Sequence, residues 1–170
     1  MIFVTTGTHE DAFDRLVQAM DGLKREGLIA QDVFIQTGYS AYKPEFCAYR
    51  DFLPFAEMMA RMTEAEMVIT HGGTGSIMLV LYHHKIPIVV PRQRKYHEHI
   101  DDHQVLFCQT MVKKGKILAA YETEQLEHII THYHDLAFPL QTVAQGNGMA
   151  QNAAAFAGKL HEICKELLNK

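Results

Sequence analysis

Short apolar runs alternate along the chain with longer runs in which apolar and polar residues mix at helical spacing. Six of the short runs are rich in β-branched and aromatic residues and are typical of buried strands. They lie at residues 2–4, 33–36, 46–50, 67–70, 86–90 and 116–119. Strands that alternate with helices imply right-handed crossovers and a parallel sheet covered on both faces. The pattern therefore predicts an α/β fold, with a doubly wound, six-stranded, Rossmann-like parallel sheet.

Helices are expected after most of these strands, because apolar residues recur there every three or four positions. We expect Thr8 to cap the first helix, with Asp11 as its capping-box partner, and Gly27 to end it. Pro54 suits the first position of another helix, and Thr123 is expected to cap a later one. Further helices are expected over residues 76–83 and 98–112, with an irregular stretch at 135–149.

A terminal helix is expected over residues 150–168. Its face carries mostly small apolar side chains, namely Ala150, Ala153, Ala154, Ala157, Leu160, Cys164 and Leu167. Such a face can pack back on its own domain or contact a partner chain, and both readings stay open. We treat residues 1–170 as a single domain.

Composition narrows the class of protein. Hydrophobic residues make up 48% of the chain and charged residues 21%, which is ordinary for a globular domain. A net charge of -4 and a pI near 6.2 argue against binding to nucleic acid. No apolar run approaches the roughly 20 residues that a membrane span needs. The three widely spaced cysteines suit neither a zinc ribbon nor a disulfide framework, so we expect a cytoplasmic protein.

Two glycine-containing loops follow predicted strands and are candidate phosphate sites. The first spans Thr5–His9, and the second spans His71–Ser76 and holds three glycines in four positions. Glycine lets a backbone approach a ligand closely, and the helix that follows presents unpaired N–H groups to an anion. The alternative is an ordinary strand-to-helix turn, which fits the first loop better than the second. Neither loop matches GxGxxG or GxxxxGK[ST], so neither is a dinucleotide fingerprint or a Walker loop.

A polar segment and a basic cluster follow the fifth predicted strand. His99 and His103 are four residues apart, so on a helix they would share a face, and spacing alone permits metal binding. Asp101, Asp102, His103 and Gln104 could instead hydrogen-bond sugar hydroxyls. The cluster at residues 92–95 could neutralise a diphosphate, face anionic lipid, or lie in a solvated loop.

Six motifs in order resemble a known family. The chain resembles the catalytic (PssE-type) subunit of two-chain bacterial capsule and exopolysaccharide glycosyltransferases. It is also similar to the C-terminal domain of the peptidoglycan N-acetylglucosaminyltransferase in glycosyltransferase family 28, and to the cytosolic subunit that adds the second N-acetylglucosamine to dolichol diphosphate. The motifs cover roughly residues 1–112 and are residues 4–10 (VTTGTHE), 13–17 (FDRLV), 36–38 (QTG), 71–76 (HGGTGS), 88–92 (IVVPR) and 102–104 (DHQ).

The resemblance implies the donor-binding half of a GT-B fold, which takes a UDP-sugar and inverts its anomeric centre without a metal or other cofactor. Distant relatives carry a glutamate that grips the ribose, and Leu79 stands at that position here. By position, the UDP-sugar site would comprise Gly7, Thr8, Gln36, Gly38, His71, Gly72, Gly73, Thr74, Gly75, Ser76, Arg92, Asp102, His103 and Gln104.

The resemblance also implies a partner, because a GT-B enzyme needs two Rossmann-like halves. That partner would be a membrane-anchored glycosyltransferase subunit that binds a lipid-linked saccharide acceptor and recruits this chain to the inner face of the membrane. The pair would act as a hexosyltransferase in capsule or exopolysaccharide synthesis. The general base would be His9 or a residue of the partner.

Three other functions remain open. A nucleotide-sugar epimerase has a related fold, but such enzymes carry both halves in one chain. A non-catalytic nucleotide-sugar-binding subunit that activates another transferase would show the same loops. A metal hydrolase built on His97, His99 and His103 is the third alternative.

Overall fold

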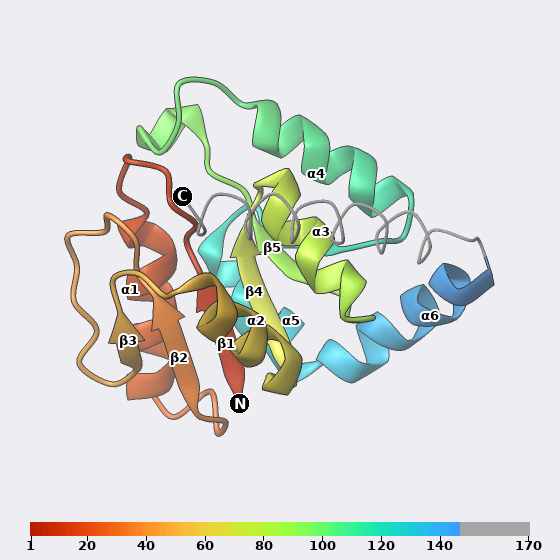
Figure 1. Ribbon diagram of the computed structural model, residues 1–170, viewed down its shortest axis with the longest axis horizontal. Helices are drawn as coiled ribbons and strands as arrows, with labels where there is room; N and C mark the ends of the chain where they lie inside the picture. The colour runs from red at the N-terminus through yellow and green to blue at the C-terminus, as the bar shows by residue number, and fades with distance from the viewer. Residues whose placement is uncertain (147–170) are drawn as a thin grey trace.

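Six parallel strands form one sheet in the order β3-β2-β1-β4-β5-β6 (Figure 1). The structure is a computed structural model that describes residues 1–146. The sequence prediction of a six-stranded parallel sheet is confirmed. The strands are β1 Ile2–Thr5, β2 Val33–Gln36, β3 Ala48–Arg50, β4 Met67–His71, β5 Ile88–Val90 and β6 Leu118–Ala119.

Strand β1 lies at the centre of the sheet and pairs with β2 on one side and β4 on the other. Ile2 is level with Val33 of β2 and with Met67 of β4. The chain moves outward from β1 to β3 and then crosses back to β4, so the strand order reverses between β1 and β4. In open α/β sheets, ligands bind at the carboxyl ends of the strands at such a point.

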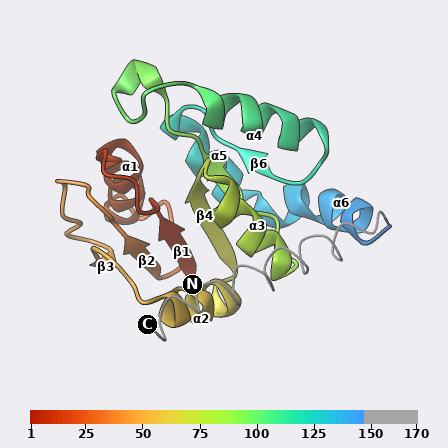
Figure 2. The same ribbon diagram turned by 45° about the horizontal axis from the view of Figure 1, so that its top comes forward.

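Helices cover both faces of this sheet, as Figures 1 and 2 show. Two short 3-10 helices, η1 (Arg94–Tyr96) and η2 (Thr123–Gln125), precede α4 and α5. The helices are α1 Asp14–Arg25, α2 Phe55–Glu64, α3 Thr74–Tyr82, α4 His103–Lys113, α5 Leu126–Thr131 and α6 Tyr133–Gly146.

Alternating side chains of β1 build a core on each face. Ile2 and Val4 are fully buried with residues of α1, α5 and α6. Phe3 points the other way and packs with residues of α2 and α3, while Val89 of β5 packs with residues of α3 and α4. Successive residues of a strand face opposite sides, so this uninterrupted apolar run is what a doubly covered strand requires.

Helix boundaries differ from the prediction at several caps. Thr8 does not cap α1, which begins at Asp14, because residues 6–13 form a loop held by other parts of the chain. Pro54 occupies the N-cap of α2, one residue before the first helical position. Glu122, rather than Thr123, forms the capping box with Gln125.

The end of α1 is as predicted. Gly27 has a positive φ of 71°, and the N–H of Leu28 reaches back to the carbonyl oxygen of Leu23 at 3.0 Å. A glycine in the left-handed region lets the chain leave a helix while its last carbonyl groups stay bonded.

Two longer segments differ from the prediction. The helix expected over residues 98–112 begins only at His103, because residues 97–102 form a loop anchored by buried Glu98. The stretch expected to be irregular continues as α6 through Pro139, because Ala137 and Leu140 pack on the core cluster. The terminal helix expected over 150–168 lies outside the described residues. Among residues 1–146, no helix is long and apolar enough to cross a membrane.

Candidate functional site

Two loops meet at the carboxyl ends of the central strands, where the strand order reverses. Residues 6–13 follow β1, and Gly72 and Gly73 follow β4 and lead directly into α3. The two strands are hydrogen-bonded neighbours, so their loops lie side by side (Figure 1). The fold therefore brings together the two candidate phosphate loops that are 66 residues apart in sequence.

The imidazole of His71 fills the space between these loops and dictates that both carry glycine. A Cβ atom on Gly7 would lie 2.7 Å from Nε2 of His71, and one on Gly73 would lie 2.9 Å from Cδ2, with other ring atoms closer still. Burial first, and then the charge of Arg92, lower the pKa of His71 to about 4. The ring is therefore neutral at physiological pH, and this partly buried side chain separates the two loops.

Gln36, at the end of β2, fixes the shape of the β1 loop. Its side-chain oxygen accepts from the Thr5 hydroxyl at 3.1 Å, and its amide nitrogen donates to the Gly7 carbonyl oxygen at 3.4 Å. The Gly7 N–H in turn donates to the Thr5 hydroxyl at 3.2 Å. Gly38 has a φ of 57°, and a Cβ atom there would lie 2.7 Å from Oγ1 of Thr6. Gln36 and Gly38 thus hold the backbone of the β1 loop in this shape.

Arg92 joins the β1 loop to the segment that follows β5. The side chain is 1% exposed, and burial lowers the pKa of its guanidinium, which neighbouring Glu98 partly counteracts. Arg92, which the sequence suggested as a diphosphate ligand, is therefore buried, and its side chain bonds the backbone of the loops. Its two terminal nitrogens donate at 2.8 to 3.2 Å to the carbonyl oxygens of Thr6, Asp11, Ala12 and Glu98.

Gln104 brings the first turn of α4 against the second glycine loop. It is 4% exposed, and its side-chain oxygen accepts the N–H of Arg92 at 3.1 Å. A Cβ atom on Gly72 would lie 2.7 Å from Cβ of Gln104. Gly72 is therefore required by the close approach of α4, just as Gly7 and Gly73 are required by His71.

The N-terminus of α3 is open. Gly73 occupies the N-cap, and no side chain among the described residues caps the helix. Thr74 is exposed, and apart from its chain neighbours and the backbone of α3 no described atom lies within 4 Å of a Cβ built on Gly75. Unpaired N–H groups and the positive end of the helix dipole suit an anion at such a terminus, and the Thr74 and Ser76 hydroxyls are further donors.

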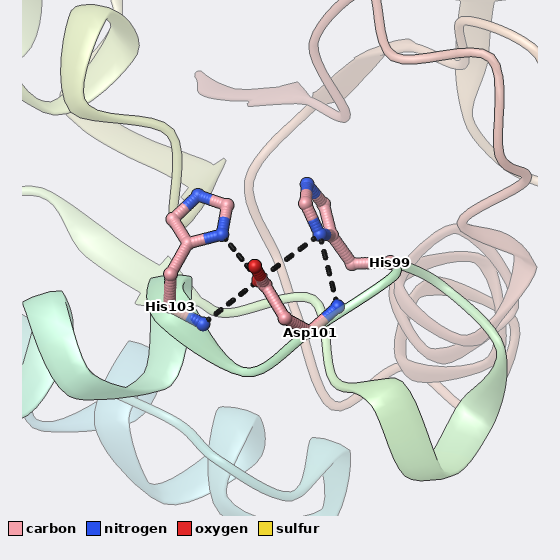
Figure 3. Close-up of side chains that lie close together, drawn as sticks. All are labelled: His99, Asp101 and His103. Atoms are coloured by element: carbon pink, nitrogen blue, oxygen red, sulfur yellow. Dashed lines mark hydrogen bonds and ion pairs between the residues drawn. The ribbon is translucent and has the colours of Figure 1, made fainter.

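Three histidines line the same edge. The rings of His9 and His99 lie 4.7 Å apart, and those of His99 and His103 lie 4.6 Å apart. Asp101 lies between His99 and His103, and its carboxylate is within 3.4 Å of Nδ1 on each (Figure 3). His97 is exposed at the end of η1 and does not join this group. Asp102 is exposed too, and its Oδ1 accepts the N–H of Arg94 at 2.9 Å.

A separate cavity of about 570 Å³ lies beside α1. Its walls include Arg15, Tyr96 and Glu98, and none of the expected site residues lines it. Arg15 donates to both carboxylate oxygens of Glu98 at 2.9 and 3.0 Å, and its guanidinium stacks 4.6 Å from the Tyr96 ring. The residues of the two glycine loops therefore lie outside this cavity.

Sequence reasoning assigned no role to two residues of this site. Thr5 and Glu98 are buried, and each accepts a backbone N–H of a loop. Asp101 was expected as a sugar ligand, and the structure places its carboxylate beside two histidines. Glu98 and Asp101 stand in a polar run that is typical of a solvated surface, so the local pattern did not indicate these contacts. Thr5 closes a strand, where a hydroxyl that turns back to the loop N–H leaves no periodic signal.

The same fold occurs in solved glycosyltransferases of low sequence identity. The chain superposes on the glycosyltransferase of kitacinnamycin with a TM-score of 0.61 at 16% identity, covering 93% of this chain and 42% of that one. SnogD from Streptomyces nogalater gives 0.55 at 17%, covering 92% and 43%, and MurG from Acinetobacter baumannii gives 0.55 at 19%, covering 93% and 49%. The chain thus spans less than half of each of these proteins.

Family membership follows from the sequence itself. No curated protein sequence matches the chain. Residues 1–163, however, match the glycosyltransferase family 28 C-terminal domain. With the parallel sheet and its switch point, this match makes the described fold one Rossmann-like half of a GT-B glycosyltransferase. The chain belongs to the glycosyltransferase family 28 C-terminal domain family.

Proposed function

We propose that this chain is the donor-binding, catalytic half of an inverting hexosyltransferase that takes a UDP-sugar. One observation carries the proposal: the open N-terminus of α3 lies beside the β1 loop at the switch point of the sheet. Two adjacent sets of backbone N–H groups suit the two phosphates of a nucleoside diphosphate. The match to glycosyltransferase family 28 supports a sugar as the group that the diphosphate carries.

The proposed contacts divide into those that touch the donor and those that hold the loops. Residues 73–76 and the exposed Thr8 would contact the diphosphate, and Asp102 and His103 would contact the sugar from the exposed start of α4. Positioning roles fall to the buried Gln36, Arg92 and Gln104 and to the partly buried His71, because their side chains bond backbone or fill the space between the loops.

In the proposed reaction, an acceptor hydroxyl attacks the anomeric carbon, the bond to the diphosphate breaks, and UDP leaves with the electron pair. The helix terminus and loop N–H groups stabilise the charge that develops on the diphosphate. His9 is the proposed base that takes the hydroxyl proton. Its Nδ1 lies 3.2 Å from the Asp11 backbone nitrogen and 3.5 Å from the Asp11 carboxylate. In the reaction, Nδ1 would carry the ring hydrogen and face this carboxylate, so that Nε2 takes the proton and the carboxylate stabilises the imidazolium that forms.

The proposal includes a second half outside this chain, because the chain spans only 42% to 49% of the glycosyltransferases it superposes on. We propose that this half is a membrane-anchored subunit that presents a lipid-diphosphate-linked saccharide in capsule or exopolysaccharide synthesis. Residues 150–168 are the proposed contact.

Calorimetric titration of the chain with UDP, UMP, ADP and NAD tests the donor site. We expect UDP to bind preferentially and Gly75→Val to abolish binding, because the new side chain occupies the space in front of the α3 N-terminus. Gly22→Val is the matched control: it makes the same change within a helix, and no described atom lies within 4 Å of its Cβ either. Equal UDP affinity in the two variants, or no preference for uridine nucleotides in the unmodified chain, contradicts the proposal.

A further inference from the structure

Three side chains with metal-ligating atoms converge where the loop after η1 enters α4. They are His99, Asp101 and His103, and their ligand atoms all lie within 4.8 Å of one another (Figure 3). We propose that they form a site for a late first-row divalent ion of the Zn²⁺ class. The proposal concerns this chain alone and goes beyond the proposed donor site, with which it shares His103.

The two imidazoles present the same ring nitrogen to one carboxylate oxygen. Oδ1 of Asp101 lies 2.5 Å from Nδ1 of His103 and 3.4 Å from Nδ1 of His99. Ligands of one tetrahedral zinc ion are separated by roughly 3.3 Å, given bond lengths of about 2.0–2.1 Å. Small side-chain rotations at Asp101 and His103 therefore suffice to admit an ion, and both side chains are more than half exposed.

The third ligand is held in place before any ion arrives. The side chain of His99 is only 9% exposed, and its ring is packed between the rings of His9 and His103. A ligand that is already fixed loses little conformational entropy on binding. His99 thus supplies a rigid base for the site, and the exposed Asp101 and His103 close on it.

The chemistry of the ligands selects the ion. Two imidazoles and one carboxylate favour Zn²⁺, Co²⁺, Ni²⁺ or Cu²⁺ over Mg²⁺ and Ca²⁺, which prefer oxygen ligands only. Three protein ligands leave a fourth position for water or another small ligand. A bound ion would join the loop of residues 97–102 to the first turn of α4.

The same contacts could serve only to stabilise the start of α4, so the variants must separate that structural role from metal binding. Asp101 accepts the backbone N–H of His103 at 3.1 Å, which by itself supports the start of α4. Asp101→Asn keeps an oxygen acceptor for that N–H and removes the charged ligand. A second histidine pair, His128 and His132, has rings 4.4 Å apart on α5 and could bind metal adventitiously. His132→Ala removes that pair and is the matched control for His103→Ala.

The experiment is a calorimetric titration of chelator-treated, untagged chain with ZnCl₂, and the visible spectrum of the Co²⁺ form. We expect one equivalent of zinc, an intense four-coordinate Co²⁺ spectrum, and no competition from excess Mg²⁺. Asp101→Asn and His103→Ala should each weaken zinc binding at least tenfold while circular dichroism stays unchanged, and His132→Ala should bind as the unmodified chain does. Undiminished affinity in His103→Ala, or loss of binding in His132→Ala, overturns the proposal.

Discussion

At the scale of the residue, His71 explains the composition of both glycine loops. Three glycines in four positions indicated a phosphate loop from sequence alone, but the ring that demands two of the glycines was invisible to local pattern. Gly7 and Gly73 flank one imidazole, and Gly72 faces Gln104. Gly75 alone faces open space. Close packing therefore explains three of these glycines, Gly7, Gly72 and Gly73. At Gly75 the absence of a side chain leaves room for a ligand.

Gly73→Ala should destabilise the chain by about 1–3 kcal/mol, because its Cβ overlaps a ring that is held on several sides. The backbone φ of -70° at Gly73 adds no strain, so the cost is purely steric. Gly75→Ala is the control, and it should be neutral or stabilise by up to about 1 kcal/mol, since alanine favours a helix. Urea unfolding measures both. An equal cost for Gly73→Ala in a His71→Ala background would show that the ring is not the cause.

The burial of neutral His71 predicts a pH dependence of stability. Its pKa is about 4 in the folded chain against 6.5 when free, so protonation favours the unfolded chain. The stability that this residue contributes is complete above pH 6.5 and is lost as pH falls toward 4, by about 3 kcal/mol at most.

Urea unfolding of the unmodified chain and of His71→Asn at pH 7.5, 5.5 and 4.5 checks this expectation. The variant lacks the titrating ring but keeps every other histidine and carboxylate. Its stability should therefore fall less between pH 6.5 and 4. Parallel pH profiles for the two proteins would mean that His71 does not carry the effect.

At the scale of the element, hydrophobic period located every strand, whereas helix ends and one whole helix were set by contacts distant in sequence. The signal for α6 was present, since Tyr133, Ala137 and Leu140 follow helical spacing, but Pro139 indicated a loop. Pro139 has no N–H to donate within the helix. This loss is outweighed by the packing of these side chains on the core and by a hydrogen bond of 2.8 Å from the Tyr133 hydroxyl to the Ile86 carbonyl oxygen. Intrinsic propensity is a weak prior when tertiary packing opposes it.

Asp21 of α1 joins that helix to the segment leading into β3. It is 1% exposed, and it accepts the N–H groups of Glu45, Phe46 and Cys47 and the hydroxyl of Tyr42 at 2.8 to 3.0 Å. Burial raises the pKa of the carboxyl, but these four bonds outweigh it and hold the pKa below 3.8.

Asp21→Asn should therefore cost about 3 kcal/mol at pH 7, because an amide nitrogen cannot accept the bonds that a carboxylate oxygen accepts. Tyr42→Phe removes one of the four bonds and should cost about 1 kcal/mol. Because the folded pKa is lowered, the stability that Asp21 contributes is present at neutral pH and is lost in acid. Guanidinium unfolding at pH 7 and pH 3 tests this, and an Asp21→Asn cost that is undiminished at pH 3 contradicts it.

At the scale of the whole molecule, the sequence predicted the family and the fold class. It did not predict the contacts that hold the loops at the carboxyl ends of the strands together. The resemblance rested on motifs that end near residue 112, and the match to the family extends over residues 1–163. Hydrogen bonds through Arg92, Glu98 and Gln104 join the loops after β1 and β5, and Gln104 also packs on Gly72 of the loop after β4. That network could not be read from sequence, because its bonds go mainly to backbone atoms.

A chain that supplies only one half of a GT-B fold is expected to bind the donor without turning it over. Stabilising a leaving diphosphate is most effective in a site closed to water, and a half-fold exposes the donor on one side. The isolated chain should therefore bind UDP yet release it from a UDP-sugar far more slowly than the roughly 1 s⁻¹ at the low end of enzyme turnover. Adding membranes that contain the acceptor-binding half should raise the release of UDP, as a coupled assay would record. Membranes with the Gly75→Val chain control for activity that the membranes bring themselves. Rapid transfer to a lipid-linked saccharide by the isolated chain would contradict the need for a second half, because this chain would then suffice for acceptor binding as well.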